Sequence, residues 1–179
     1  MINLDDCVLI IVDVQEKLRL VMSERDKLVK NLSILVQGAK VLGIPVISCR
    51  QYPQAIGDTI PEIKEHLGDI SPVDKRCFSC AASDEFMEKL KASGAKHCIV
   101  CGIESHVCVY QTVRDLQRLG FHTHVPVDGI ASRISENKQV AVERMRHEGA
   151  ILTSVEMVLF ELLQTSEHPD FRTISKLIK

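Results

Sequence analysis

Short apolar runs alternate with longer amphipathic stretches along the chain. The clearest run, Cys7 to Asp13, reads CVLIIVD and is apolar on both faces up to its last residue. Strands of this kind are covered on both sides, as in a parallel sheet. From similar patterns we expect strands at residues 7–13, 45–50, 97–102 and 121–127, and weaker ones at 69–75 and 150–153.

Helical periodicity fills the intervals between these runs. A serine stands at the expected start of four helices, where its hydroxyl can accept a hydrogen bond from a free backbone N–H group. These serines are Ser23, Ser83, Ser135 and Ser154. We also expect helices at residues 61–68 and from the turn at 102–105 to residue 119, helical turns within 169–179, and a loop at 51–60.

Strands that alternate with helices predict an α/β fold. The spacing indicates a three-layer α/β/α sandwich around a six-stranded, mostly parallel sheet with Rossmann-like topology. The sequence contains no repeat, low-complexity tract or linker, so residues 1–179 are expected to form a single domain. In such sheets ligands bind beyond the carboxyl ends of the strands.

Composition and charge narrow the classes of partner. The net charge is −2, only 4% of the residues are aromatic and Trp is absent, so a nucleic-acid partner is not expected. No apolar run reaches the roughly 18 residues that span a bilayer, so no membrane partner is expected either. Acidic residues precede the first short apolar run, which is unlike a signal peptide. A cytoplasmic location is therefore the expectation.

Three reactive side chains fall at the carboxyl ends of predicted strands. Asp13 ends the first strand, Lys75 ends the third, and Cys108 lies in the first turn of the helix that follows the fourth. A thiol near a helix start is a candidate nucleophile, because free amides and the helix dipole favour negative charge there. Asp13 would accept the thiol proton, Lys75 would offset the negative charge, and amides within 103–108 would bind an oxyanion.

Each of these residues also has a simpler structural interpretation. Cys108 alone would most often be a buried packing residue. Asp13 alone would be a helix cap, and Lys75 alone a solvated loop charge. Their combination at one edge of the sheet is what favours catalysis.

The seven cysteines allow a second interpretation. Cys77-x-x-Cys80 and Cys98-x-x-Cys101 have the spacing of a structural zinc site. However, residues three apart in a strand face opposite sides of the sheet, which places Cys98 and Cys101 apart. The number of cysteines is odd and the chain is not small, which also disfavours a disulfide framework.

The chain resembles the isochorismatase-like cysteine hydrolases, the superfamily that includes nicotinamidases and N-carbamoylsarcosine amidase. The segments that carry the resemblance are VLIIVDVQ (8–15), VDKRCFS (73–79) and CGIESHVCVYQTVRDL (101–116). The loop RQYPQAIGDTIPE (50–62) is similar to that of the short isochorismatase domain-containing proteins. The resemblance implies that Asp13, Lys75 and Cys108 form a catalytic triad. It also implies a cis peptide bond between Ile103 and Glu104 whose backbone helps form the oxyanion hole.

One departure from the family pattern bears on cofactors and substrates. Nicotinamidases carry an Asp-x-His metal motif after the second strand, where this chain has Gln51-Tyr52-Pro53. We therefore expect no catalytic metal and no other cofactor, and nicotinamide becomes a less favoured substrate. The complete triad favours amide chemistry over the vinyl ether cleavage of true isochorismatases.

The resulting hypothesis is a cysteine hydrolase that cleaves a small amide or related C–N bond through a thioester at Cys108. Gln15, Tyr52 and Phe78 are candidate substrate-binding residues, and the family resemblance implies a homo-oligomer with a small-molecule substrate. The alternatives are a catalytically weak binding protein with the same fold and a redox-responsive protein built around an activated thiol.

Overall fold

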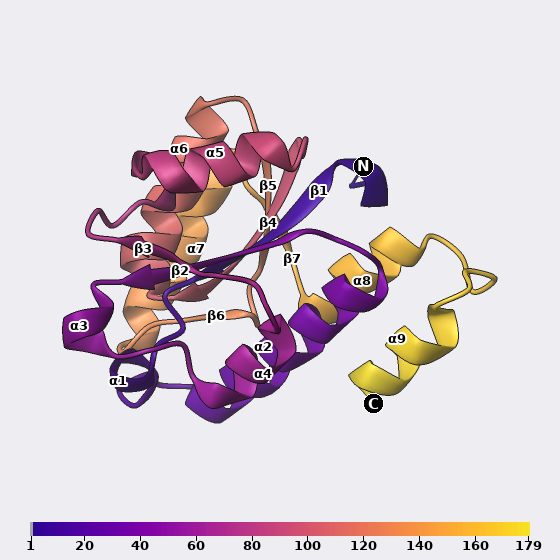
Figure 1. Cartoon of the computed structure of the whole chain (residues 1–179), viewed down its shortest axis with the longest axis horizontal. Helices are drawn as coiled ribbons and strands as arrows, with labels where there is room; N and C mark the ends of the chain where they lie inside the picture. The colour runs from indigo at the N-terminus through magenta and orange to yellow at the C-terminus, as the bar shows by residue number, and fades with distance from the viewer. Residues whose placement is uncertain (1) are drawn as a thin grey trace.

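The computed structural model describes residues 2–179 and shows a parallel sheet with helices on both faces (Figure 1). The strands are β1 (Cys7–Val12), β2 (Val46–Gln51), β3 (Val73–Lys75), β4 (His97–Ile103), β5 (His122–Pro126), β6 (Ile130–Ala131) and β7 (Ile151–Thr153). Their order is β3-β2-β1-β4-β5-β7, with β6 paired to the end of β4, and every pairing is parallel. The predicted fold class is confirmed.

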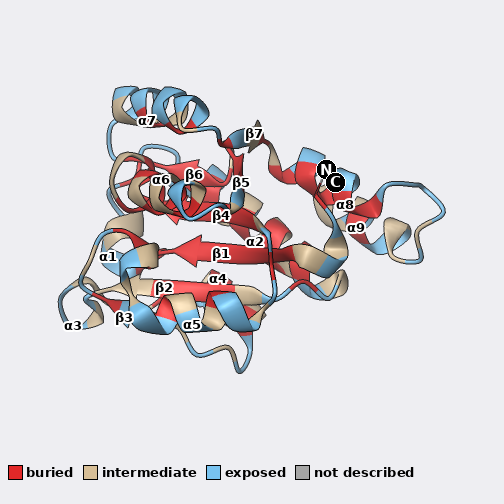
Figure 2. Ribbon diagram, turned by 90° about the horizontal axis from the view of Figure 1, so that it is seen from above, coloured by how far each residue is buried: buried red, intermediate tan, exposed pale blue. Residues whose placement is uncertain are grey.

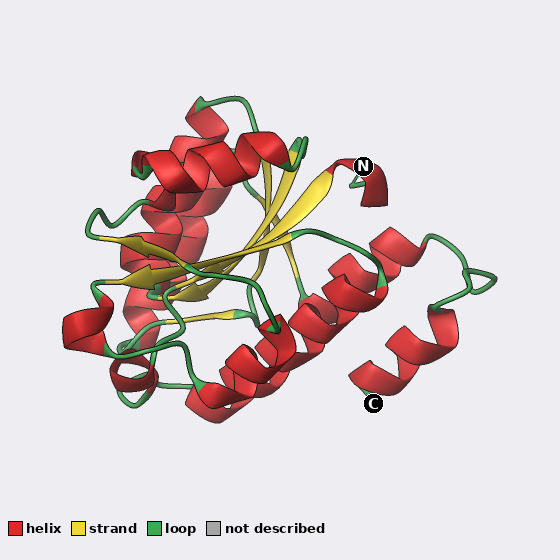
Figure 3. Cartoon of the chain, viewed as in Figure 1, coloured by secondary structure: helices red, strands yellow, loops and turns green. Residues whose placement is uncertain are grey.

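Two helical layers cover the sheet (Figure 3). The helices are α1 (Glu16–Arg19), α2 (Arg25–Val41), α3 (Pro53–Ile56), α4 (Pro61–Leu67), α5 (Asp84–Ala92), α6 (Tyr110–Arg118), α7 (Ser135–His147), α8 (Val155–Leu163) and α9 (Phe171–Ile178). The core on one face draws on α2, α4, α8 and α9, and the core on the other face on α5, α6 and α7. Strand β1 is buried along its whole length between the two layers (Figure 2).

The sheet has seven strands, so the prediction of six was wrong by one. The additional strand, β6, has only two residues, which pair with Gly102 and Ile103 of β4. Two residues are too few to show the alternation that marks a strand in a sequence. β6 matters for the site because it lies beside the end of β4.

The predicted helix starts are partly right. The hydroxyls of Ser83 and Ser154 accept hydrogen bonds from the third backbone N–H groups of α5 and α8. Ser23 does not cap α2, which begins at Arg25; its hydroxyl donates to the carbonyl of Ser132 at 2.9 Å. A tertiary contact has replaced the local cap.

The expected loop at residues 51–60 is more ordered than its sequence suggested. Strand β2 continues to Gln51, and the short helix α3 follows. Tyr52 turns the chain between them with φ of 36° and ψ of 67°, in the left-handed region. The chain therefore turns at the carboxyl edge of the sheet, directly after β2.

Candidate active site

Asp13 ends β1 in a conformation that few residue types adopt. Its φ is 52°, in the left-handed region, which aspartate tolerates better than most residues. Its backbone N–H donates to the carbonyl of Cys49 at 3.1 Å, which fixes the turn against β2. The side chain is fully buried, and Oδ1 has no hydrogen-bond partner within residues 2–179. The Asp13 carboxyl also lies close enough to the Cys108 thiol to interact with it.

Lys75 ends β3 and points its ammonium group at Asp13. Nζ lies 2.8 Å from Asp13 Oδ2, and neither side chain is exposed. Nζ also donates to the side-chain oxygen of Gln51 at 2.8 Å and to the carbonyls of Cys77 and Phe78 at 3.2 and 3.1 Å. A buried ammonium is tolerated only when it is paired and hydrogen-bonded, and Lys75 meets both conditions.

Cys108 lies in a π-helical turn, Ser105–Val109, between β4 and α6. π turns occur frequently at functional sites. The carbonyl of Cys108 accepts a hydrogen bond from the Thr112 hydroxyl at 2.7 Å, and that hydroxyl in turn accepts from the backbone N–H of Cys80 at 2.9 Å. The thiol-bearing turn is therefore tied to the segment that follows Lys75.

The peptide bond between Ile103 and Glu104 is cis, the conformation that the family resemblance implied. The Glu104 carboxylate accepts hydrogen bonds from the backbone N–H of Arg133 at 3.0 Å and from its Nε at 3.1 Å. His106 Nδ1 lies 3.0 Å from the hydroxyl of Ser132. These contacts fasten residues 104–106 to the chain that follows β6.

The amides expected to bind an oxyanion are not all available. The backbone N–H of Val107 donates to the carbonyl of Glu104 at 3.1 Å. The N–H group of Val107 is therefore engaged within the turn and is not available to an oxyanion, unlike the expectation for residues 103–108.

The three side chains shift one another's pKa. Burial raises the pKa of the Cys108 thiol far above its usual value, and the adjacent Asp13 carboxylate raises it further. Burial also raises the pKa of Asp13, against the opposing effect of Lys75. Burial lowers the pKa of Lys75, but the negative charge of Asp13 and neighbouring thiols outweighs it, so the net direction is upward. The raised pKa of Cys108 favours the neutral thiol, so attack by its sulfur requires a group that takes up the proton.

The three candidate substrate-binding residues differ in their placement. Tyr52 is 38% exposed and stacks under the guanidinium of Arg76, and Phe78 is 53% exposed. Gln15 is fully buried, and both of its polar atoms are engaged by main-chain groups of Gln51 and Gly57. Gln15 is therefore placed to hold the loop rather than to contact a substrate.

Sequence reasoning missed Gln51. It lies at the carboxyl end of β2, where site residues are expected, yet an amide carries no chemical signature of a catalytic group. Its contact with Lys75 depends on how the amide is turned, which a residue pattern does not encode.

The cysteines lie on both faces of the sheet, and Cys49 and Cys80 are close enough to interact. All seven cysteines are free thiols. Cys98 and Cys101 contribute to the cores on opposite faces of the sheet, as their spacing predicted. Across residues 2–179, no group of three or more His, Cys, Asp or Glu side chains is arranged to hold a metal ion. In the same range, no helix combines the length and the apolar character needed to cross a membrane.

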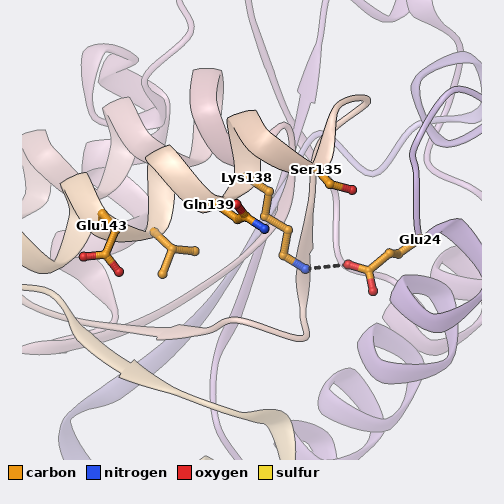
Figure 4. Close-up of a pocket in the computed structure, with 6 residues that line it drawn as sticks. Glu24, Ser135, Lys138, Gln139 and Glu143 are labelled. Atoms are coloured by element: carbon orange, nitrogen blue, oxygen red, sulfur yellow. Dashed lines mark hydrogen bonds and ion pairs between the residues drawn. The ribbon is translucent and has the colours of Figure 1, made fainter.

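A cavity of about 620 Å³ opens elsewhere on the surface, between the start of α2 and helix α7. Figure 4 shows the ion pair at its edge, where Lys138 Nζ lies 2.9 Å from a carboxylate oxygen of Glu24. Its lining residues are Glu24, Ser135, Lys138, Gln139, Val142 and Glu143, and none of them belongs to the candidate site.

The parallel sheet and its two helical layers identify the chain as an α/β protein with a hydrolase fold. Residues 7–157 match the family model described as the isochorismatase domain, and the chain belongs to the isochorismatase family. It is 38% identical to the secreted isochorismatase effector Isc1 of Phytophthora sojae, over 96% of this chain and 84% of that protein. It is 34% identical to isochorismatase domain-containing protein 2 of Danio rerio, over 96% of this chain and 86% of that protein.

Solved structures agree on the fold. The MAR1 ribonuclease of Caenorhabditis elegans superposes with a TM-score of 0.93 and 36% identity, covering 99% of this chain and 91% of that one. The YcaC protein of Escherichia coli, described as an octameric hydrolase of unknown specificity, superposes with a TM-score of 0.89 and 24% identity, covering 98% and 94%. At that identity the second likeness bears on the fold alone.

Proposed function

We propose that the protein is a cysteine hydrolase that cleaves a small amide or a related C–N bond. The observation that carries the proposal is the buried ion pair between Lys75 Nζ and Asp13 Oδ2 at 2.8 Å, with the Cys108 thiol close enough to the Asp13 carboxyl to interact with it. A carboxylate that an ion pair holds next to a thiol is placed to accept the thiol proton.

In the proposed mechanism Asp13 accepts the thiol proton as Cys108 Sγ attacks the carbonyl carbon of the substrate. The C–N bond then breaks as Asp13 returns the proton to the leaving nitrogen, which leaves a thioester on Cys108. Water attacks the thioester, gives a proton to Asp13 and releases the acid, and the proton returns to the sulfur. Lys75 remains charged throughout and stabilises the negative charge on sulfur, while backbone amides of the turn stabilise the oxyanion.

A substrate screen tests this proposal directly. We expect a panel of small amides, ureas and carbamoyl compounds to yield a substrate whose turnover falls at least about a thousandfold in Cys108→Ala. Mass spectrometry of the wild type should detect an acyl adduct at Cys108. Cys98→Ala, which removes a buried thiol of β4, is the matched control and should retain turnover. Full activity in Cys108→Ala would contradict the mechanism.

A second candidate activity is suggested by the relative described as a ribonuclease, which is 36% identical. Phosphodiester hydrolysis does not pass through a thioester, so the same variant separates the two activities. Cleavage of single-stranded RNA that survives in Cys108→Ala would favour the second candidate over amide hydrolysis.

We further propose that the chain forms a homo-oligomer and that Tyr52 and Phe78 contact the substrate. Exposed apolar side chains on the loops at the carboxyl edge of the sheet support the first point, since large exposed side chains of this kind often mark interaction surfaces. They are Leu20, Val21, Tyr52, Phe78 and Ile134. Tyr52 and Phe78 lie on the edge of the sheet that holds Cys108, which supports their proposed contact with the substrate.

A further inference from the structure

The side chain of Gln51 joins two consecutive residues at the end of β3. Its Oε1 accepts a hydrogen bond from Lys75 Nζ at 2.8 Å, and its Nε2 donates to the carbonyl of Arg76 at 2.8 Å. An ammonium group only donates and a carbonyl only accepts. The orientation of the Gln51 amide is therefore fixed by its partners, with the oxygen towards Lys75.

Gln15 holds the main chain of Gln51 from the other side. Its Oε1 accepts from the Gln51 backbone N–H at 2.7 Å, and its Nε2 donates to the Gln51 carbonyl at 3.0 Å. The same Nε2 donates to the carbonyl of Gly57 at 2.7 Å. Gln15 is fully buried, so this clamp is shielded from water. Gln51 consequently approaches Lys75 from a rigid support.

The charge on Lys75 is balanced by one group. Of its four hydrogen-bond acceptors, Asp13 is a carboxylate, while the Gln51 amide and the carbonyls of Cys77 and Phe78 are neutral. When Asp13 takes the proton of Cys108, the ammonium is left to face the developing thiolate. A second carboxylate at the position of Gln51 would compete for that positive charge.

We propose that Gln51 is a positioning residue for the Asp13–Lys75–Cys108 site. Its neutral oxygen fixes the Lys75 ammonium in place without drawing its charge away from Asp13 and Cys108. The role rests on the proposed function, because it takes Cys108 to be the reactive group.

Alkylation of Cys108 by iodoacetamide tests this role without a known substrate. The rate constant is measured peptide by peptide with mass spectrometry, between about pH 6 and 9, because it follows the thiolate available at each pH. Gln51→Glu has nearly the same shape and adds one negative charge beside Lys75. We expect its rate profile to shift to higher pH by about one unit, which lowers the rate about tenfold at a given pH.

Two variants serve as controls. Gln54→Glu adds the same charge on the exposed surface of α3, and its rates are expected to stay within about twofold of the wild type because water screens that charge. Gln51→Met removes the acceptor without adding a charge. Lys75 then loses one of the groups that hold its ammonium beside Asp13, so we expect a smaller shift to higher pH, of about half a unit.

The outcomes separate this proposal from the proposed function. A Gln51→Met profile that coincides with the wild type would overturn the positioning role. A Gln51→Glu shift no larger than that of Gln51→Met would overturn the part played by the neutral charge of Gln51. Should Cys108→Ala retain the turnover of a substrate found in the screen, the proposed function fails and the role of Gln51 fails with it. Melting temperatures of all variants show whether each one is folded.

Discussion

At the scale of single residues, His124 links folding to pH. The side chain is 2% exposed, and its Nε2 lies 2.9 Å from Nδ1 of His97. Its Nδ1 is buried without a partner among the described residues. A buried N–H group without an acceptor costs more than an unpaired lone pair, so the proton belongs on Nε2, which then donates to His97. Burial, with the neighbouring His97 and His122, lowers the pKa of His124 to about 4.

This lowered pKa sets the sign of a pH effect. Unfolding restores the ordinary value of 6.5, so the unfolded chain binds a proton more readily between about pH 4 and 6.5. The free energy of unfolding should therefore rise with pH across that window, by about 3 kcal/mol in total from this group. Urea denaturation at a series of pH values measures the slope.

The matching variants isolate His124 from the other titrating groups. His124→Gln should flatten the slope in this window, whatever its effect on overall stability. His147→Gln, which removes an exposed histidine from α7, should leave the slope as it is in the wild type. An unchanged slope in His124→Gln would assign the pH dependence to other residues.

Residue patterns alone located Asp13, Lys75 and Cys108 because strand ends in a parallel sheet share one edge. They did not locate Gln51 or separate Gln15 from the exposed Tyr52 and Phe78. Those distinctions depend on side-chain orientation and on hydrogen bonds between distant segments, which hydrophobic periodicity does not describe.

At the scale of elements, the pairing of β1 with β4 depends on Gly102. Its φ is 114°, and a Cβ atom there would lie 2.1 Å from the carbonyl oxygen of Val12. The residue after Val12 is Asp13. The absence of a side chain at Gly102 thus lets β4 approach β1 at the point where the candidate site begins.

Gly102→Ala should therefore be strongly destabilising. We expect a loss of at least about 3 kcal/mol in the free energy of unfolding, because backbone atoms of β1 would have to move. Gly94→Ala is the control, since Gly94 also has a positive φ but no atom within 4 Å of the added Cβ. Its expected cost is about 1 kcal/mol, from backbone conformation alone. Equal losses in the two variants would contradict the packing argument.

The elements most visible in the sequence are those with many buried positions. Helix α2 buries Leu28, Leu32, Leu35 and Ala39 at helical spacing, and β1 buries every residue. The short elements α3 and β6 went unrecognised because they contain few residues and owe their form to neighbours such as β4.

At the scale of the whole molecule, the site is assembled from segments that lie far apart in the chain. Asp13 and Lys75 are 62 positions apart, yet their side chains are in contact. The adjacency arises from the strand order, which places β1 between β2 and β4 and β3 beyond β2. The order agrees with the expected Rossmann-like topology, although apolar runs alone identify strands without identifying their neighbours.

The proposed homo-oligomer is tested at this scale. Size-exclusion chromatography with light scattering should give a mass that is a multiple of the 20.0 kDa chain. Replacing both Leu20 and Val21 with Ser should lower that mass if the exposed apolar loops take part in assembly. A wild-type mass equal to one chain at all concentrations would contradict the proposal.

The ion pair between Glu104 and Arg133 restricts which loops can be exchanged between relatives. Glu104 adjoins the turn that bears Cys108, its side chain is nearly buried, and its partner sits in the segment after β6. A graft that imported residues 128–134 from another protein without an arginine at position 133 would leave the Glu104 carboxylate with the backbone N–H of residue 133 but without its cationic partner. The loop after β6 and the turn that bears Cys108 would then have to be inherited together, as one transferable unit rather than two.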